Sequence, residues 1–130
     1  MKKALVFFLL ATFGSGFRAP SVVPEVSIIE LIADPARYDA TEIIVRGFLM
    51  VEHEGNELFL SKEHAQYNIH SSLWVSYKNG NVSEVEAIKF HKQYVQITAY
   101  YNKDIRGHSG VDKGALVQIK SIVPLREWFK

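Results

Sequence analysis

The chain has 130 residues, with 15 basic and 14 acidic side chains, which is the size of one domain with almost no net charge. It contains no cysteine, which excludes disulfides, thiolate metal sites and a lipidated N-terminal cysteine. A near-neutral domain also lacks the basic surface that sequence-independent nucleic-acid binding needs.

Residues 1–19 have the order of a secretory signal peptide: two lysines, one apolar run and then small residues. The run is shorter than the roughly 20 apolar residues of a transmembrane helix. We therefore predict cleavage after Gly16 or Ala19, a periplasmic or secreted protein, and no membrane span after cleavage. An uncleaved anchor is the alternative. Cleavage after Ala19 removes 3 of the 15 basic residues, which leaves 12 against 14 acidic ones and a charge of −2 in domain 20–130.

Capping patterns predict short helices in this domain. Ser27 and Glu30 have the spacing of a capping box before an apolar stretch, so a helix is expected to begin there. Pro35 ends this helix or restarts it, because proline suits a first helical turn. Ser61 predicts a capped helical turn, and a second capping box beginning at Ser83 predicts another short helix.

Alternation of side chains with period two predicts five strands in the same domain. The first is long and has apolar residues on both faces, which indicates that both faces are partly covered. A turn rich in polar residues follows it, so the first two strands are expected to form a hairpin. The predicted strands cover residues 42–52, 57–60, 73–77, 93–101 and 115–123.

Two stretches carry a family resemblance: Ile32–Asp39, which contains Asp-Pro and Tyr-Asp, and Ile43–Leu49, a strand with a central glycine. They resemble small exported bacterial proteins of the oligonucleotide/oligosaccharide-binding (OB) fold, mostly of unknown function. The resemblance implies a mainly β protein, a small five-stranded OB-like barrel with an N-terminal helix and a short helix before the last two strands. It places Gly47 where the first strand bends. Ala40 stands where the family often has glycine.

In OB folds, ligands lie across the middle strands and the loops that follow strands one and four. On the fourth strand, alternation assigns Val95, Ile97, Ala99 and Tyr101 to the core. Tyr94, Gln96 and Tyr100 share the other face, where they are suited to stack on a sugar or base and to hydrogen-bond it. The alternative is that they only pack against neighbouring strands. Trp74 on the third strand has the same two interpretations. We expect Trp128 to plug one end of the barrel.

Arg106 and His108 lie in the glycine-rich loop before the last strand, where they are suited to bind an anionic group. The alternative is a flexible connection that uses glycine for positive φ. The five histidines include no pair at the close helical or strand spacing of zinc ligands. We therefore predict no metal site, no cofactor and no catalytic residue.

Together these features predict an exported, non-catalytic binding or interaction module. An envelope protein or a saccharide-like ligand is the favoured partner, and nucleic acid is an unlikely one. Two other functions stay open: a metal-dependent phosphodiesterase, and a single-stranded nucleic-acid binder.

Overall fold

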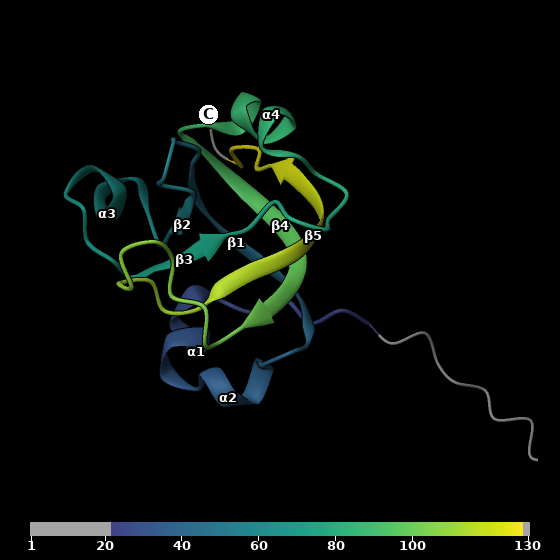
Figure 1. Cartoon of the computed structure of the whole chain (residues 1–130). Helices are drawn as coiled ribbons and strands as arrows, with labels where there is room; N and C mark the ends of the chain where they lie inside the picture. Colours follow the sequence, from purple (N-terminus) through teal and green to yellow (C-terminus); the bar gives the residue numbers. More distant parts are fainter. Residues whose placement is uncertain (1–21, 129–130) are drawn as a thin grey trace, which may run out of the picture.

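The computed structural model describes residues 22–128, so the predicted leader at 1–19 lies outside the described part. Five strands close into a barrel in the order β1-β2-β3-β5-β4 (Figure 1). The predicted OB-like barrel is confirmed. The strands are β1 (Glu42–Met50), β2 (Glu57–Phe59), β3 (Ser72–Val75), β4 (Gln93–Asn102) and β5 (Ala115–Pro124).

The long strand β1 serves both sides of the barrel. It pairs antiparallel with β4 along most of its length and with β2 at its end, and Phe48 and Leu49 have partners in both. Gly47 lies just before this change of partner. A Cβ there would lie 2.6 Å from the carbonyl oxygen of Phe59 and 2.8 Å from Cγ of Leu58. Glycine is therefore required by close approach of β2, in agreement with the predicted bend.

The barrel closes through β5, which pairs antiparallel with β4 and parallel with β3. The β4–β5 pairing shifts register between Thr98 and Tyr100, where a bulge helps to curve the sheet. Inward-facing side chains from all five strands fill the interior. The core residues on β4 are the four predicted from alternation: Val95, Ile97, Ala99 and Tyr101, each 0% exposed.

Short helices cover the ends of the barrel. Helices α1 (Ile28–Ala33) and α2 (Pro35–Tyr38) lie at one end, and α4 (Glu84–Ala87) with the 3-10 turn η1 (Ile88–Phe90) lies at the other (Figure 1). Helix α3 (Lys62–Gln66) lies beside β2. Both predicted capping boxes are present, and Ser61 caps α3. The caps matter because helices this short have few hydrogen bonds of their own.

One expectation about packing is wrong. Trp128 does not plug the barrel, because its side chain is 94% exposed. It lies beside the start of β4, near the barrel end that α4 and η1 cover, whereas Ile28 and Leu31 of α1 fill the opposite end. Within residues 22–128, no helix is long and apolar enough to cross a lipid bilayer.

Candidate ligand pocket

A pocket of about 530 Å³ lies over the outer face of β2 and β3. The turn after β1 forms one rim, with Glu52, Glu54 and Gly55, and the loop between β4 and β5 forms the other, with Ser109 and Val111. In OB folds, this strand face and these two loops are the region that binds oligonucleotides and oligosaccharides. The fold therefore directs attention to this pocket over the other hollows of the described surface.

Trp74 and Glu57 form the centre of the pocket. They are direct cross-strand partners in the β2–β3 pairing, so both side chains project from the same outer face. The backbone of Gly107 in the β4–β5 loop passes close to Trp74 and to the carboxyl group of Asp112. A Cβ on Gly107 would lie 2.8 Å from Cε3 of Trp74, and its φ of 75° is in the left-handed region. Glycine here lets the loop pack against the indole ring.

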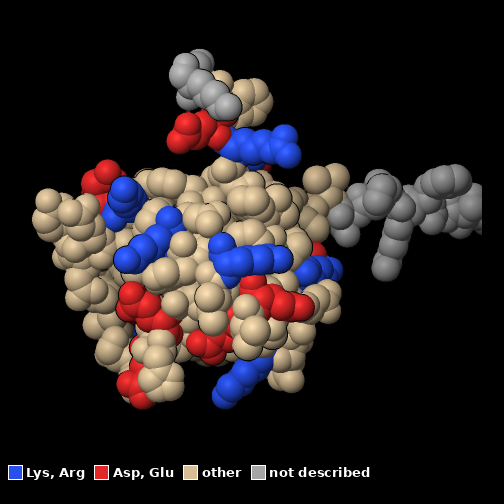
Figure 2. All heavy atoms as spheres, turned by 90° about the horizontal axis from the view of Figure 1, so that it is seen from above, with Lys and Arg blue, Asp and Glu red and all other residues tan. Residues whose placement is uncertain are grey.

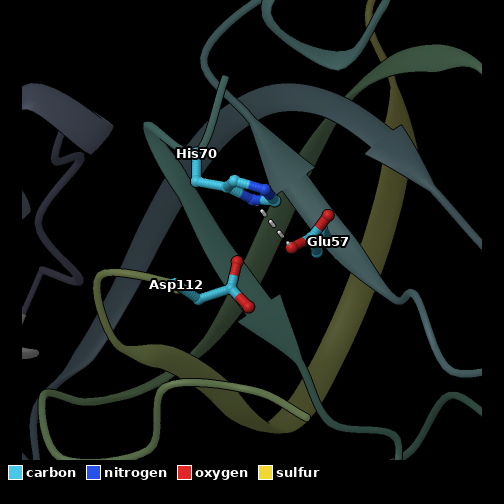
Figure 3. A group of neighbouring side chains, drawn as sticks. All are labelled: Glu57, His70 and Asp112. Atoms are coloured by element: carbon cyan, nitrogen blue, oxygen red, sulfur yellow. Dashed lines mark ion pairs between the residues drawn. The ribbon is translucent and has the colours of Figure 1, made fainter. Parts of the chain in front are cut away.

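Three side chains that can bind a metal meet beside Trp74: Glu57 from β2, His70 just before β3, and Asp112 from the β4–β5 loop (Figure 3). Their ligand atoms all lie within 4.8 Å of one another. Nδ1 of His70 lies 3.4 Å from Oε1 of Glu57. Asp112 is 1% exposed, and the Glu57 side chain is 13% exposed. Asp112 is thus buried in the barrel wall, whereas Glu57 and His70 are partly covered and reach the pocket.

The carboxyl group of Asp112 is fixed on one side only. Oδ1 accepts a hydrogen bond of 2.8 Å from the hydroxyl of Ser72, whereas Oδ2 is buried and has no hydrogen-bond partner among the described residues. Nδ1 of His70 is likewise buried without a hydrogen-bond partner in the described part of the chain. Unsatisfied buried polar atoms are costly, so two at one place require an explanation.

The cluster changes the acidity of Glu57. Burial foremost, and then the adjacent Asp112 carboxylate, raise the pKa of Glu57 from 4.5 to about 8. The more distant Glu52 carboxylate acts in the same direction. Without a cation, Glu57 is therefore mostly protonated at neutral pH. The facing carboxyl groups of Glu57 and Asp112 thus avoid placing two negative charges side by side.

The pocket lining is acidic. Glu52, Glu54 and Glu57 all contribute to it, and none of the described residues that line it is lysine or arginine. Elsewhere, basic and acidic side chains are intermingled, as on the face shown in Figure 2. The negative character is therefore a local property of the pocket and not of the whole surface, and it disfavours anionic ligands there.

Of the predicted site residues, Trp74 lies in the pocket and the three on β4 do not. Tyr94 accepts a hydrogen bond of 2.9 Å from the backbone N–H of Lys62, and its ring contacts Phe48 edge-on at 5.2 Å between centroids. Gln96 accepts a hydrogen bond of 3.1 Å from Arg46. Tyr100 lies under Nζ of Lys120, 6.0 Å from the ring centroid. These contacts agree with the packing alternative for the face of β4 that carries them.

Arg106 and His108 do not line the pocket, and Arg106 lines a different hollow beside α1. The Nε of Arg106 donates a hydrogen bond of 3.2 Å to the backbone oxygen of Asp112, so this side chain braces its own loop. His108 is exposed on the same loop, next to Ser109, which does line the pocket.

Sequence analysis did not single out Glu57, His70 or Asp112. Each of them is an ordinary polar residue at a strand end or in a loop, and they are far apart in the chain. Only barrel closure through β2, β3 and β5 brings them together. The one available signal is the fold itself, because the expected OB barrel places the strand β2 and the β4–β5 loop at the ligand face.

Comparisons with known proteins agree on the fold and add no function. No protein-family model and no curated protein matches this sequence. Among solved structures, the chain is similar to a protein from Leishmania major Friedlin assigned as an aspartyl-tRNA synthetase, with a TM-score of 0.50 and 9% identity. The match covers 88% of this chain and 23% of the other. At this identity, the likeness shows a shared barrel fold only.

Proposed function

We propose that this chain is an exported, non-catalytic binding module that holds an uncharged saccharide-like ligand in the pocket around Trp74. The observation that carries the proposal is the position of this tryptophan. It lies on the ligand face of an OB barrel, in a lining that offers carboxylate acceptors and, among the described residues, no lysine or arginine.

The lining suits the chemistry of a sugar. The apolar faces of a sugar ring pack against aromatic rings, and its hydroxyl groups donate hydrogen bonds to carboxylates and amides. Trp74 offers the ring, and Glu52, Glu54 and Asn68 offer acceptors along the wall. A volume of about 530 Å³ lies within the range of small-molecule sites, which is on the order of 300–1,000 Å³.

The same lining argues against the two alternatives. Single-stranded nucleic acids need cationic side chains along the phosphate path, and a metal-dependent phosphodiesterase needs them beside its metal ion to hold the substrate phosphate. The described lining offers carboxylates instead, which repel phosphate. Arg106 is near, but its Nε is already hydrogen-bonded to the loop backbone.

Export is the second part of the proposal, and the order of residues at 1–19 supports it. We expect the full-length chain, expressed in a bacterial host, to be recovered from the envelope fraction with Phe17 or Pro20 as its first residue. Intact mass spectrometry of the purified protein measures this directly. Recovery in the cytosol with an intact N-terminus would contradict the export proposal and leave the pocket unaffected.

Binding is tested by tryptophan fluorescence. The chain has two tryptophans, and Trp128 is 94% exposed, so the substitution Trp128→Phe leaves Trp74 as the only reporter without disturbing the barrel. This variant is titrated with uncharged oligosaccharides of glucose, mannose and N-acetylglucosamine, and separately with oligogalacturonate and single-stranded oligothymidine. We expect a saturable change with at least one uncharged sugar and none with the two anionic polymers.

The matched variants compare one tryptophan with the other. In calorimetric titration with the sugar that binds, Trp74→Leu should lose most of the affinity, while Trp128→Leu should keep it. Leucine keeps apolar volume at position 74 and removes the aromatic face, so folding can be checked by circular dichroism. Equal affinity in both variants, or binding by the anionic polymers only, would refute the proposed site.

A further inference from the structure

We propose that Glu57, His70 and Asp112 form a binding site for one divalent transition-metal ion, with Zn²⁺ as the reference ion, at the base of the pocket (Figure 3). This inference does not depend on the saccharide proposal, because metal binding can be measured without any sugar. It differs from the expectation drawn from the spacing of the histidines, which gave no metal site.

Two buried atoms without partners carry the argument. Oδ2 of Asp112, in a residue that is 1% exposed, and Nδ1 of His70 both face the cluster, and neither has a hydrogen-bond partner among the described residues. Both atoms are metal-ligand types with a free lone pair when Asp112 is ionised and Nδ1 is unprotonated. The carboxyl group of Glu57 is the described protein group that faces both residues, and a cation held by all three would take the place of its proton.

The distances are close to those of a metal site. With ligand bonds of about 2.0–2.2 Å, the ligand atoms of a tetrahedral zinc ion are roughly 3.3–3.6 Å apart. Nδ1 of His70 and Oε1 of Glu57 already have this separation, at 3.4 Å. The remaining ligand atoms lie within 4.8 Å of one another, so small side-chain rotations complete the site.

The surroundings supply what a bound ion needs. One imidazole and two carboxylates suit Zn²⁺ and similar ions, and three protein ligands leave a position open for water or a ligand hydroxyl. Ser72 holds the second oxygen of Asp112 at 2.8 Å, as outer partners of metal-binding carboxylates do. The raised pKa of Glu57 is consistent with this site, because the two neighbouring carboxyl groups attract positive charge. In the metal-free protein a proton supplies that charge where a cation would bind.

A metal-free explanation makes a different prediction. If Glu57 is simply a neutral buried acid beside Asp112, the cluster is structural and has no particular affinity for cations. The two explanations are separated by titrating the purified, chelator-treated protein with ZnCl₂ in competition with a chromophoric chelator. We expect one Zn²⁺ per chain. Stoichiometry well below one, or affinity no better than that of surface histidines, would overturn the proposal.

Variants locate the ion. We expect His70→Gln and Asp112→Asn each to weaken Zn²⁺ binding by at least about tenfold, because even outer-shell changes cost that much. Asparagine keeps an oxygen that can accept the bond from Ser72. The matched control is His108→Gln, an exposed histidine on the same loop as Asp112, which should keep its affinity within about twofold. Equal affinity in all three would show adventitious surface binding.

A measurement on the unmodified protein covers the case in which a variant fails to fold. Addition of Co²⁺ should give a visible d–d absorption band at one equivalent, and imidazole resonances in ¹⁵N NMR should shift for His70 alone. Zn²⁺ should then abolish the Co²⁺ band by displacement. Broadening of the exposed histidines with no change at His70 would refute the site without the need for any variant.

Discussion

The burial of Glu57 predicts an unusual dependence of stability on pH, which the substitution Glu57→Gln isolates. In the native metal-free protein the pKa of Glu57 is about 8, against 4.5 for the exposed side chain. Between these values the native state holds a proton that the unfolded chain has released. The free energy of unfolding therefore falls as pH rises. The stabilising contribution of the proton on Glu57 is fully present below pH 4.5 and is lost by about pH 8.

The size of the effect follows from the shift. Each pH unit in this window changes the free energy of unfolding by about 1.4 kcal/mol, so the whole window is worth on the order of a few kcal/mol. Because Glu57 lines a pocket that is open to solvent, screening reduces this figure, which is an upper bound. Glutamine has the same shape and no proton to release, so the variant should lack this slope.

The assay is urea denaturation of both proteins at pH 5 to 9 in the presence of a chelator. The charged and titratable groups that face Glu57 are Asp112, Glu52 and His70, and they are present in both proteins. The difference between the two curves therefore reports Glu57. We expect similar stability near pH 5 and a more stable variant near pH 8.5. Parallel curves across this range would refute the reasoning about burial.

Two further substitutions test the packing around the site. Gly47→Ala should destabilise the protein by about 1–3 kcal/mol, because the added Cβ would lie 2.6 Å from the backbone oxygen of Phe59. Gly55→Ala is the matched control, since no atom would lie nearer than 3.6 Å to its Cβ. It should change stability by less than about 0.5 kcal/mol in the same urea titrations. Ser72→Ala should cost about 1.5–3 kcal/mol, since it removes the buried hydrogen bond to the Asp112 carboxylate. Thermal melts that place Ser72→Ala level with the unmodified protein would contradict that role.

Most of the fold could be predicted from sequence because its signals are local. Alternation along β4 identified the buried set correctly, and Ser27 and Ser83 cap the helices that their capping boxes predict. Both features depend on residues within one turn or one strand. The prediction for Trp128 was wrong. Whether this side chain packs on the barrel depends on the path of the chain after β5, and no local sequence pattern determines that path.

The candidate site could be predicted only in part. The OB fold indicates the ligand face, and Trp74 was identified as one of its residues. The tyrosines of β4 share strand alternation with Trp74, and Tyr94 lines another hollow beside Trp128, so alternation alone cannot say which outer face binds a ligand. The cluster of Glu57, His70 and Asp112 depends on three chain segments meeting after the barrel closes, and no spacing along the sequence encodes that meeting.

The central claim is that ligand binds around Trp74 on the β2–β3 face, and mapping by ¹⁵N NMR tests it most directly. The labelled protein is titrated with the uncharged oligosaccharide that gives the strongest fluorescence response. We predict shifts at the Trp74 indole N–H and at the backbone amides of Gly55, Asn68 and Ser109, which line the pocket. Shifts confined to the β4 face that carries Tyr100, with these four groups unchanged, would contradict the account.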